Sequence, residues 1–251
     1  MSTKPSSYEV FDQDARERGS YSYTTDRLSS RTSNARINAA MFGFNLLAGK
    51  SVIDIGCGDG TYTAELFAGG ADTVLGVEPG AEAVEVARRK NAPAGGRVPE
   101  FQVCNAYDLE SLGRTFDVAV VRGVIHHIPD PLRGIRQMCK VARDILVIEP
   151  NGYNPVLKLI EKISPYHREH QELSYTRAKL AGWFAEAGAT LQSHTYIGLV
   201  PFFCPDWMVR PLKAMEGLVE SVPLVRTLMC GQVVMHFRSG SGTGENRQAH
   251  G

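Results

Sequence analysis

The sequence predicts an α/β fold, a doubly wound and mostly parallel seven-stranded sheet with helices on both faces. Three observations predict it. Short apolar runs rich in β-branched residues alternate with segments of helical spacing. A glycine-rich turn at residues 56–60 directly follows the first of these runs. The chain has 251 residues, 43% hydrophobic and 22% charged, which is enough for one large soluble domain.

Each strand is expected where an apolar run lies between turn-forming residues. The expected strands are residues 51–55, 73–78, 100–104, 116–121, 145–149, 189–199 and 233–237. The expected helices are residues 27–48, 61–67, 81–90, 131–142, 154–163 and 176–187. Gly49 is a stop signal for the first helix, and Asp130 with Pro131 is a start signal for the fourth.

Composition divides the chain into three parts. Residues 1–48 are expected to form an N-terminal helical cap or lid, and residues 49–238 the ligand-binding domain. Residues 239–251, rich in Gly and polar residues, are expected to be a disordered tail. Within the domain, the Pro-rich segment 201–228 is expected to be a lid-like insertion.

We expect a helix in this insertion to begin at Pro211 and to have an apolar and a polar face. The apolar face carries Met215, Leu218, Val219 and Val222, and the polar face carries Lys213, Glu216 and Glu220. The simplest interpretation is that the apolar face packs on the sheet. A lid over an apolar ligand and a homodimer interface are the alternatives.

Charge and cysteine content exclude several classes of protein. Lys+Arg and Asp+Glu both number 27, so the whole chain has no electrostatic footprint for nucleic acid or for an anionic membrane. The five cysteines form no C-x-x-C pair, which favours reduced thiols in a cytoplasmic protein. No apolar run approaches membrane-spanning length, so we expect no integral membrane contact.

The glycine spacing limits the kind of nucleotide that the first turn can bind. A dinucleotide site reads G-x-G-x-x-G, but the third glycine position here is Thr61, and glycine falls one residue earlier. No lysine follows the turn as a P-loop requires. Asp54 at the strand end would repel a pyrophosphate and suits a cationic ligand.

The Asp-x-Gly-x-Gly-x-Gly order of residues 54–60 resembles motif I of the class I S-adenosylmethionine (SAM) dependent methyltransferases, in particular their small-molecule branch. The resemblance extends over about residues 50–200 through five ordered segments. It implies the Rossmann-like methyltransferase fold, with SAM as cofactor and methyl donor. It also makes residues 49–238 the SAM-binding domain.

The same resemblance implies a set of cofactor-binding residues. Glu78 with Pro79 would hold the ribose, and Asn105 with Ala106 would lie at the adenine, where the family usually has Asp and this chain has an amide. The segment that starts at Arg122 would run beside the methionine part. The complete set is Asp54, Gly56, Cys57, Gly58, Glu78, Pro79, Asn105, Ala106 and Arg122.

A SAM methyl group is already electrophilic, so the protein must orient a nucleophile and take up a proton if that nucleophile is a hydroxyl. We expect His170 or His127 as the general base, with His167 as a further candidate. The expected acceptor-binding residues are Tyr23, His126, Tyr166, Phe202 and Trp207. No metal is expected, because the Asp/Asp-Asn set of the catechol-type metal-dependent relatives is missing.

The sequence therefore predicts a SAM-dependent methyltransferase that acts on a small-molecule acceptor. O-methylation in natural-product, sugar or lipid biosynthesis is the favoured reaction. The Asn-Pro-Pro-Tyr signature of amide or exocyclic nitrogen methylation does not follow the fourth strand, and basic clusters for nucleic acid are absent. N- or C-methylation of a small molecule, and a SAM-binding module without catalysis, remain as alternatives.

Overall fold

A computed structural model describes residues 26–92, 96–163 and 173–240. Within them, seven strands form one sheet in the order β3-β2-β1-β4-β5-β7-β6. The strands are β1 Ser51–Ile55, β2 Thr73–Glu78, β3 Glu100–Val103, β4 Phe116–Arg122, β5 Ala142–Pro150, β6 Ala189–Ile197 and β7 Gln232–Ser239. The first five strands are parallel, and β7 is antiparallel to both β5 and β6. The predicted mostly parallel seven-stranded sheet is confirmed.

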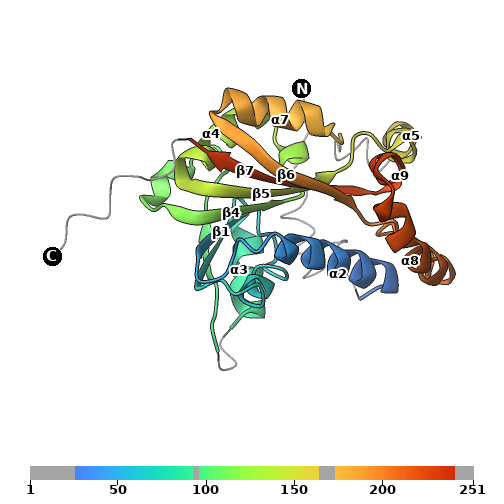
Figure 1. Cartoon of the computed structure of the whole chain (residues 1–251). Helices are drawn as coiled ribbons and strands as arrows, with labels where there is room; N and C mark the ends of the chain where they lie inside the picture. Colours follow the sequence, from blue (N-terminus) through green and yellow to red (C-terminus); the bar gives the residue numbers. More distant parts are fainter. Residues whose placement is uncertain (1–25, 93–95, 164–172, 241–251) are drawn as a thin grey trace, which may run out of the picture.

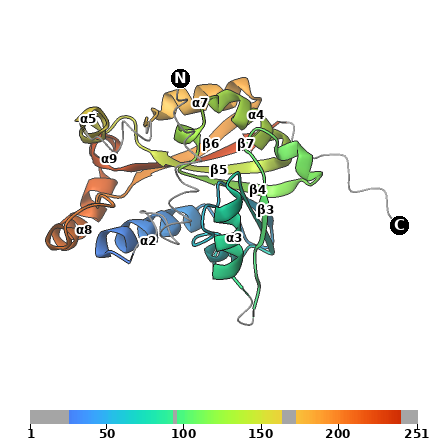
Figure 2. The same cartoon turned by 180° about the vertical axis from the view of Figure 1, so that it is seen from behind.

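Helices cover both faces of this sheet. The helices are α2 Leu28–Gly43, α3 Ala81–Lys90, α4 Pro131–Val141, α5 Pro155–Ile163, α7 Arg177–Glu186, α8 Asp206–Ser221 and α9 Pro223–Met229. Helices α4 and α7 lie on one face and α2 and α3 on the other, while α5, α8 and α9 gather at one end of the molecule (Figures 1 and 2). Short 3-10 helices are η2 Ala64–Phe67, η3 Leu109–Leu112 and η4 Ile125–His127.

The strands at the centre of the sheet are apolar on both sides because both sides are covered. On β1, Ile53 and Ile55 pack in the cluster that includes Met138 of α4. Val52, which points to the opposite face, packs in the cluster that includes Met41 of α2. This double burial explains why the first strand reads as a nearly continuous apolar run.

Two predicted helices differ in the structure. The first ends at Gly43 and not near residue 48, because Asn45 adopts a left-handed conformation with φ of 54°. Residues 61–67 form turns and the short helix η2, not the predicted α-helix. There, Thr61 donates to Asp59 at 2.6 Å and Thr63 to Asp54 at 2.7 Å. Such local side-chain hydrogen bonds compete with helix formation.

The end of the last strand also differs from the prediction. Strand β7 continues to Ser239, whose hydroxyl donates to the carbonyl of Cys139 at 2.8 Å. The first residue of the predicted tail is therefore a buried strand residue. The rest of that tail, residues 241–251, lies outside the described residues, as do four predicted site residues, Tyr23, Tyr166, His167 and His170.

Helix α8 begins at Asp206, five residues before the predicted start, and continues through Pro211. Packing explains the early start. Val209, in the first part of the helix, is buried against Val200 and Cys204, with Met208 partly buried beside them. Tertiary packing thus overrides the local stop that proline represents.

The two faces of α8 are only partly exchanged relative to the simplest interpretation of the sequence, since Val219 of the expected apolar face is buried and Lys213 of the expected polar face is exposed. Glu216 is buried, whereas Met215 and Leu218 are exposed. Arg36 of α2 explains the exchange, because its guanidinium bonds Glu220 (Nε–Oε1 3.0 Å) and lies 3.9 Å from Glu216. The hydrogen bond to Glu220 raises the pKa of Arg36 further above its usual range.

Candidate cofactor and acceptor site

The glycine loop after β1 has backbone conformations that only glycine adopts without strain. Gly56, Gly58 and Gly60 have φ of 75°, 55° and 72°. A Cβ on Gly56 would lie 2.4 Å from a methyl carbon of Val124. The amides of Gly56 and Cys57 both donate to the carbonyl of Val77, at 2.8 and 3.1 Å. The loop is therefore held against the ends of β2 and β4.

Asp54 lies at the end of β1, just before this loop, and its carboxylate is buried. The hydroxyl of Thr63 donates to Oδ2 at 2.7 Å. Burial raises the pKa of Asp54 to about 6, while the hydrogen bond from Thr63 and the nearby Arg122 guanidinium act against this rise. A buried carboxylate of this kind gains most from a cationic partner.

Glu78 ends β2 and contacts the glycine loop directly. Its Oε2 accepts a hydrogen bond from the amide of Gly58 at 3.1 Å. This bond fixes the carboxylate at the carboxyl ends of two neighbouring strands, where ligands of doubly wound sheets bind. Cys57 lies in the same loop, and burial raises the pKa of its thiol well above the usual range. Cys57 packs against the cluster of Val84, Ala87 and Phe101, and its contact with the cofactor stays a prediction.

A pocket of about 300 Å³ lies beside this carboxylate. It is lined by Pro79, Val103, Cys104, Asn105, Asp108 and Ser111. The pocket brings together Pro79 and Asn105, which the sequence placed at the ribose and the adenine. Oδ1 of Asn105 accepts from the amide of Tyr107 at 3.0 Å, so the residue forms an Asx turn. The neighbouring Ala106 is buried.

Arg122, the last residue of β4, connects the loop to helix α2. Its guanidinium lies 4.0 Å from the ring centroid of Tyr62 and donates to Asn38 at 3.0 Å and to Asn34 at 2.6 Å. Burial lowers the pKa of Arg122. The side chain orders α2 against the glycine loop, and direct contact of Arg122 with SAM stays a prediction.

Glu149 near the end of β5 organises the turn that follows β4. Its Oε1 accepts from the amides of Val124 and Ile125 at 2.9 and 2.8 Å. Its Oε2 lies 2.6 Å from Nδ1 of His126. The carboxylate is almost completely buried. It therefore holds both the backbone of the turn and one imidazole ring.

His127 comes directly after His126 in the chain, and the two ring centroids lie 3.9 Å apart. The structure thus brings together two of the predicted residues, one expected to contact the acceptor and one expected to act as base. Tyr175 lies near this group. Burial raises the pKa of its hydroxyl, and the charge of Glu149 raises it further.

Phe202 and Trp207, the two aromatic residues expected to bind the acceptor, differ in their exposure to solvent. Phe202 is partly buried and packs against the cluster that includes Ile197, and its carbonyl accepts from Ser29 at 2.6 Å. Trp207 is 77% exposed on α8 and does not form the wall of a closed cavity in the described structure. Its role in acceptor binding stays a prediction.

The sequence did not predict the residues that hold the site side chains in place and that lie far from them along the chain. Asn34 and Asn38 lie 84 to 88 residues from Arg122 in the chain. Thr63 falls in a segment that we expected to be helical. Glu149 carried a signal, because an acidic residue ends an apolar strand, but no pattern pairs it with His126.

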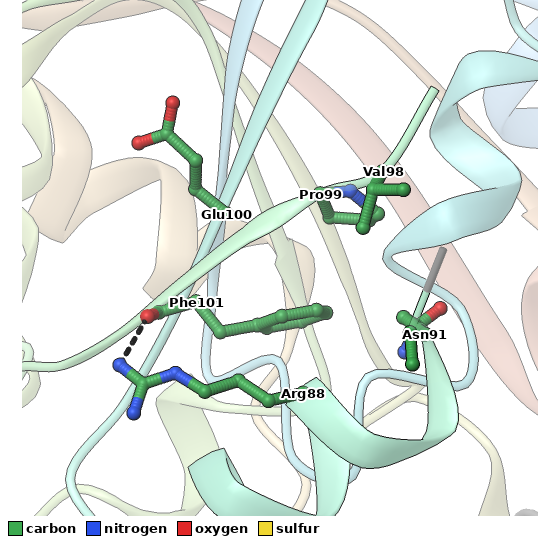
Figure 3. Close-up of a pocket in the computed structure, with 7 residues that line it drawn as sticks. Arg88, Asn91, Val98, Pro99, Glu100 and Phe101 are labelled. Atoms are coloured by element: carbon green, nitrogen blue, oxygen red, sulfur yellow. Dashed lines mark hydrogen bonds between the residues drawn. The ribbon is translucent and has the colours of Figure 1, made fainter. Parts of the chain in front are cut away.

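Another pocket, of about 370 Å³, lies between the end of α3 and the start of β3 (Figure 3). Arg88 donates to the carbonyl of Phe101 across it at 2.7 Å. The ring of Phe101 would meet a Cβ on Gly60 at 2.9 Å, so this pocket lies behind the glycine loop. None of the predicted site residues lines it.

The sheet order, the glycine loop and the acidic ends of β1 and β2 define a Rossmann-like domain built to bind a nucleoside with a cationic group. Residues 28–194, more than half of the chain, match the family model described as a methyltransferase domain. The chain therefore belongs to this family, the class I SAM-dependent methyltransferases.

Among curated proteins, the chain is similar to the ubiquinone biosynthesis O-methyltransferase of Aliivibrio fischeri, with 33% identity over 118 residues, 47% of each chain. The protein of the same name from Pseudomonas fluorescens is 29% identical over 157 residues, 58% of this chain and 67% of its own. The chain spans about half the length of most of the curated relatives it matches.

Solved structures establish the fold. The magnesium protoporphyrin IX methyltransferase of Synechocystis with bound S-adenosylhomocysteine (SAH) aligns with a TM-score of 0.64 at 16% identity, over 92% of this chain and 97% of its own. The [4+2]-cyclase SpnF aligns with a TM-score of 0.63 at 16% identity, over 95% and 98%. The second likeness shows that this fold also carries other chemistry.

Proposed function

We propose that this protein transfers the methyl group of SAM to a hydroxyl of a small-molecule acceptor. The pair formed by Glu149 and His126, whose ring lies tilted against that of His127, carries the proposal. These imidazole rings follow the end of β4, and this position supports a role beside bound SAM. The similarity to ubiquinone biosynthesis O-methyltransferases supports oxygen as the methylated atom, and a phenol is the hydroxyl acceptor that we test first.

The geometry of the loop supports the proposed cofactor-binding residues. Asp54 would face the cationic amino acid part, and Glu78 the ribose, from its place against the amide of Gly58. The pocket at Pro79 and Asn105 would take the adenine. When bound, SAM supplies the electrophilic methyl group. The residues of this chain bind it, orient the acceptor and move the acceptor's proton.

We assign the general base to His127. Glu149 fixes the ring of His126, and His126 in turn packs on His127 and limits its orientations. A phenol is acidic enough that such a base adds at most about 10²–10⁴-fold to the rate. His170 and His167, the other candidates, lie outside the described residues, and their roles stay predictions.

Calorimetry with SAH tests the cofactor, and transfer of labelled methyl from SAM to a panel of catechols and other phenols tests the reaction. We expect SAH to bind and H127A to lose at least about tenfold in kcat with little change in SAH affinity. Absence of SAH binding overturns the proposal.

His236→Asn is the matched control. His236 pairs with Asp144 at 2.7 Å near the start of β5, whereas Glu149 lies near its end. We expect H236N to keep kcat even where it lowers the melting temperature. If H127A retains the full rate on every phenol, and the wild type methylates an amine faster than any phenol, the reaction is N-methylation.

A further inference from the structure

The exposed large apolar side chains of the described chain are concentrated at one end of the molecule. All of them except Val98 and Val103 lie between residues 156 and 229. Most of these lie on helices α5, α8 and α9, which lie together in both views (Figures 1 and 2), while Leu173, Phe203 and Val222 lie in the segments between helices. We call this region the apolar end surface. It includes Val156 and Leu159 of α5, Trp207 and Leu218 of α8, and Leu224 and Leu228 of α9.

These side chains are largely exposed to solvent. Trp207, Leu218 and Leu224 are 77%, 71% and 70% exposed. Single exposed apolar residues are normal on a protein surface, but a contiguous group on three neighbouring helices marks an interaction site. The partial exchange of the two faces of α8 contributes to this surface, because Arg36 bonds Glu220 on the inner side while Met215 and Leu218 lie on the outside.

The charged side chains of these helices are also divided between an inner and an outer side. The side chains of Glu161, Glu216 and Glu220 are 11%, 5% and 15% exposed, because each bonds backbone or cations on the inner side. By contrast, Arg210 is exposed, whereas the half-exposed Lys213 pairs with Glu216.

Lys162 adds a second exposed cation, on α5, while Asp206 at the start of α8 is the exposed carboxylate of that helix. The end surface therefore combines apolar side chains with an excess of cations. The balanced charge of the whole chain conceals this local division.

Apolar and cationic side chains on one face, with a tryptophan among them, complement one kind of partner. A bilayer that contains anionic lipids offers an apolar interior below a negatively charged surface. A second copy of the chain fits less well, since a two-fold contact through this face would bring its exposed cations toward like charges. Among the described residues, no helix is long and apolar enough to cross a membrane, so the contact is peripheral.

We propose that the apolar end surface docks this protein on anionic lipid bilayers. Trp207 enters the interface between headgroups and acyl chains, where tryptophan is favoured. Leu218 and Leu224 insert beside it, and Arg210 with Lys162 contact the lipid phosphates. The inference goes beyond methyl transfer and does not depend on it, because its measurement is vesicle binding.

Co-sedimentation with vesicles tests the proposal. The full chain is mixed with vesicles of phosphatidylcholine alone, or with vesicles that also contain about 30% phosphatidylglycerol. The second composition gives the vesicle a negative surface potential. We expect binding to the anionic vesicles and much weaker binding to the neutral ones. Trp207 fluorescence should shift to shorter wavelength on binding, and W207F should lose this shift although Trp183 remains.

Two double variants separate the apolar and the cationic contributions. L218Q/L224Q should weaken binding by at least about tenfold, because two apolar side chains no longer insert. R210Q/K162Q should remove most of the preference for anionic lipid. V98Q, at an exposed apolar position on another part of the molecule, is the matched control and should bind as the wild type does. Circular dichroism confirms that each variant is folded.

Three outcomes overturn the proposal. The first is absence of binding to the anionic vesicles. The second is undiminished binding by L218Q/L224Q. The third is a dimer in light scattering that the L218Q/L224Q substitutions convert to a monomer, when neither the wild type nor the variant binds vesicles. That result assigns the surface to a second copy of the chain.

Discussion

Nδ1 of His126 lies 2.6 Å from Oε2 of Glu149, and the other oxygen of the same carboxylate binds two consecutive amides, those of Val124 and Ile125. One buried side chain on β5 therefore determines both the path of the chain after β4 and the orientation of an imidazole ring. This relationship connects the fold to the proposed chemistry, because the same turn carries His127.

Glu149→Gln tests this connection. A glutamine has one acceptor oxygen and an NH₂ group in place of the second, so it cannot accept from His126 and from both amides. We expect the unfolding free energy to fall by about 1–3 kcal/mol and kcat by at least about tenfold. The pH dependence of kcat should change as well, since Glu149 acts through the histidines.

Glu186→Gln is the control for that variant, because Glu186 forms an exposed pair with Arg136. Equal kcat values and equal pH profiles for E149Q and the wild type would show that the carboxylate is only structural.

Asp54 gives the protein a stability that depends on pH. Its pKa is about 6 in the folded state against an ordinary 3.8, so the folded state binds the proton more tightly than the unfolded state does. The protonated form therefore stabilises the fold fully below about pH 4, and this contribution is lost as pH rises through about 6. The difference corresponds to about 3 kcal/mol. Denaturant titrations should show this slope in the wild type and not in D54N.

The same titration should control the cofactor affinity. An ionised Asp54 attracts the ammonium group of SAH, so calorimetry should show weaker binding as pH falls from 7 to 5. Thr63→Val removes the hydrogen bond that favours the ionised carboxylate and should move the midpoint to higher pH. A flat pH profile in the wild type, or the same profile in D54N, contradicts the role of Asp54.

Arg36→Met tests why the faces of α8 are partly exchanged. Its guanidinium bonds Glu220 and lies beside the buried Glu216. Loss of a cation next to buried carboxylates should cost about 2–4 kcal/mol of unfolding free energy. R136Q breaks the exposed pair with Glu186 and should cost less than about 1 kcal/mol. If the two variants cost the same, Arg36 does not hold the helix.

Gly56→Ala tests the tight contact at the glycine loop. Alanine at φ of 75° is strained, and its Cβ would also clash with Val124 at 2.4 Å. Gly113→Ala is the matched control, because Gly113 has φ of 60° but no atom within 4 Å of the new Cβ. We expect G113A to cost about 1–2 kcal/mol and G56A clearly more, with loss of SAH binding. Thermal unfolding of both variants measures the difference, and equal melting temperatures would contradict it.

The sequence by itself determined the sheet and the place of the cofactor loop. Both follow from local properties, since a strand buried on two faces must be continuously apolar and a turn with φ near +75° requires glycine at Gly56. Short-range signals also located the start of α4, where Asp130 accepts from the amide of Arg133 at 3.1 Å.

Only the tertiary structure decided which side chains meet. Arg36 and Glu220 are separated by 184 residues, and Glu149 lies on β5 whereas His126 lies in η4, after β4. Helix α8 shows the physical reason. Its hydrophobic pattern predicted an inward apolar face, but a guanidinium from α2 bonds Glu220 on the inner side, and Met215 and Leu218 lie outside while Val219 stays buried. A pattern along one helix cannot contain the charge of a partner that only the fold brings to it.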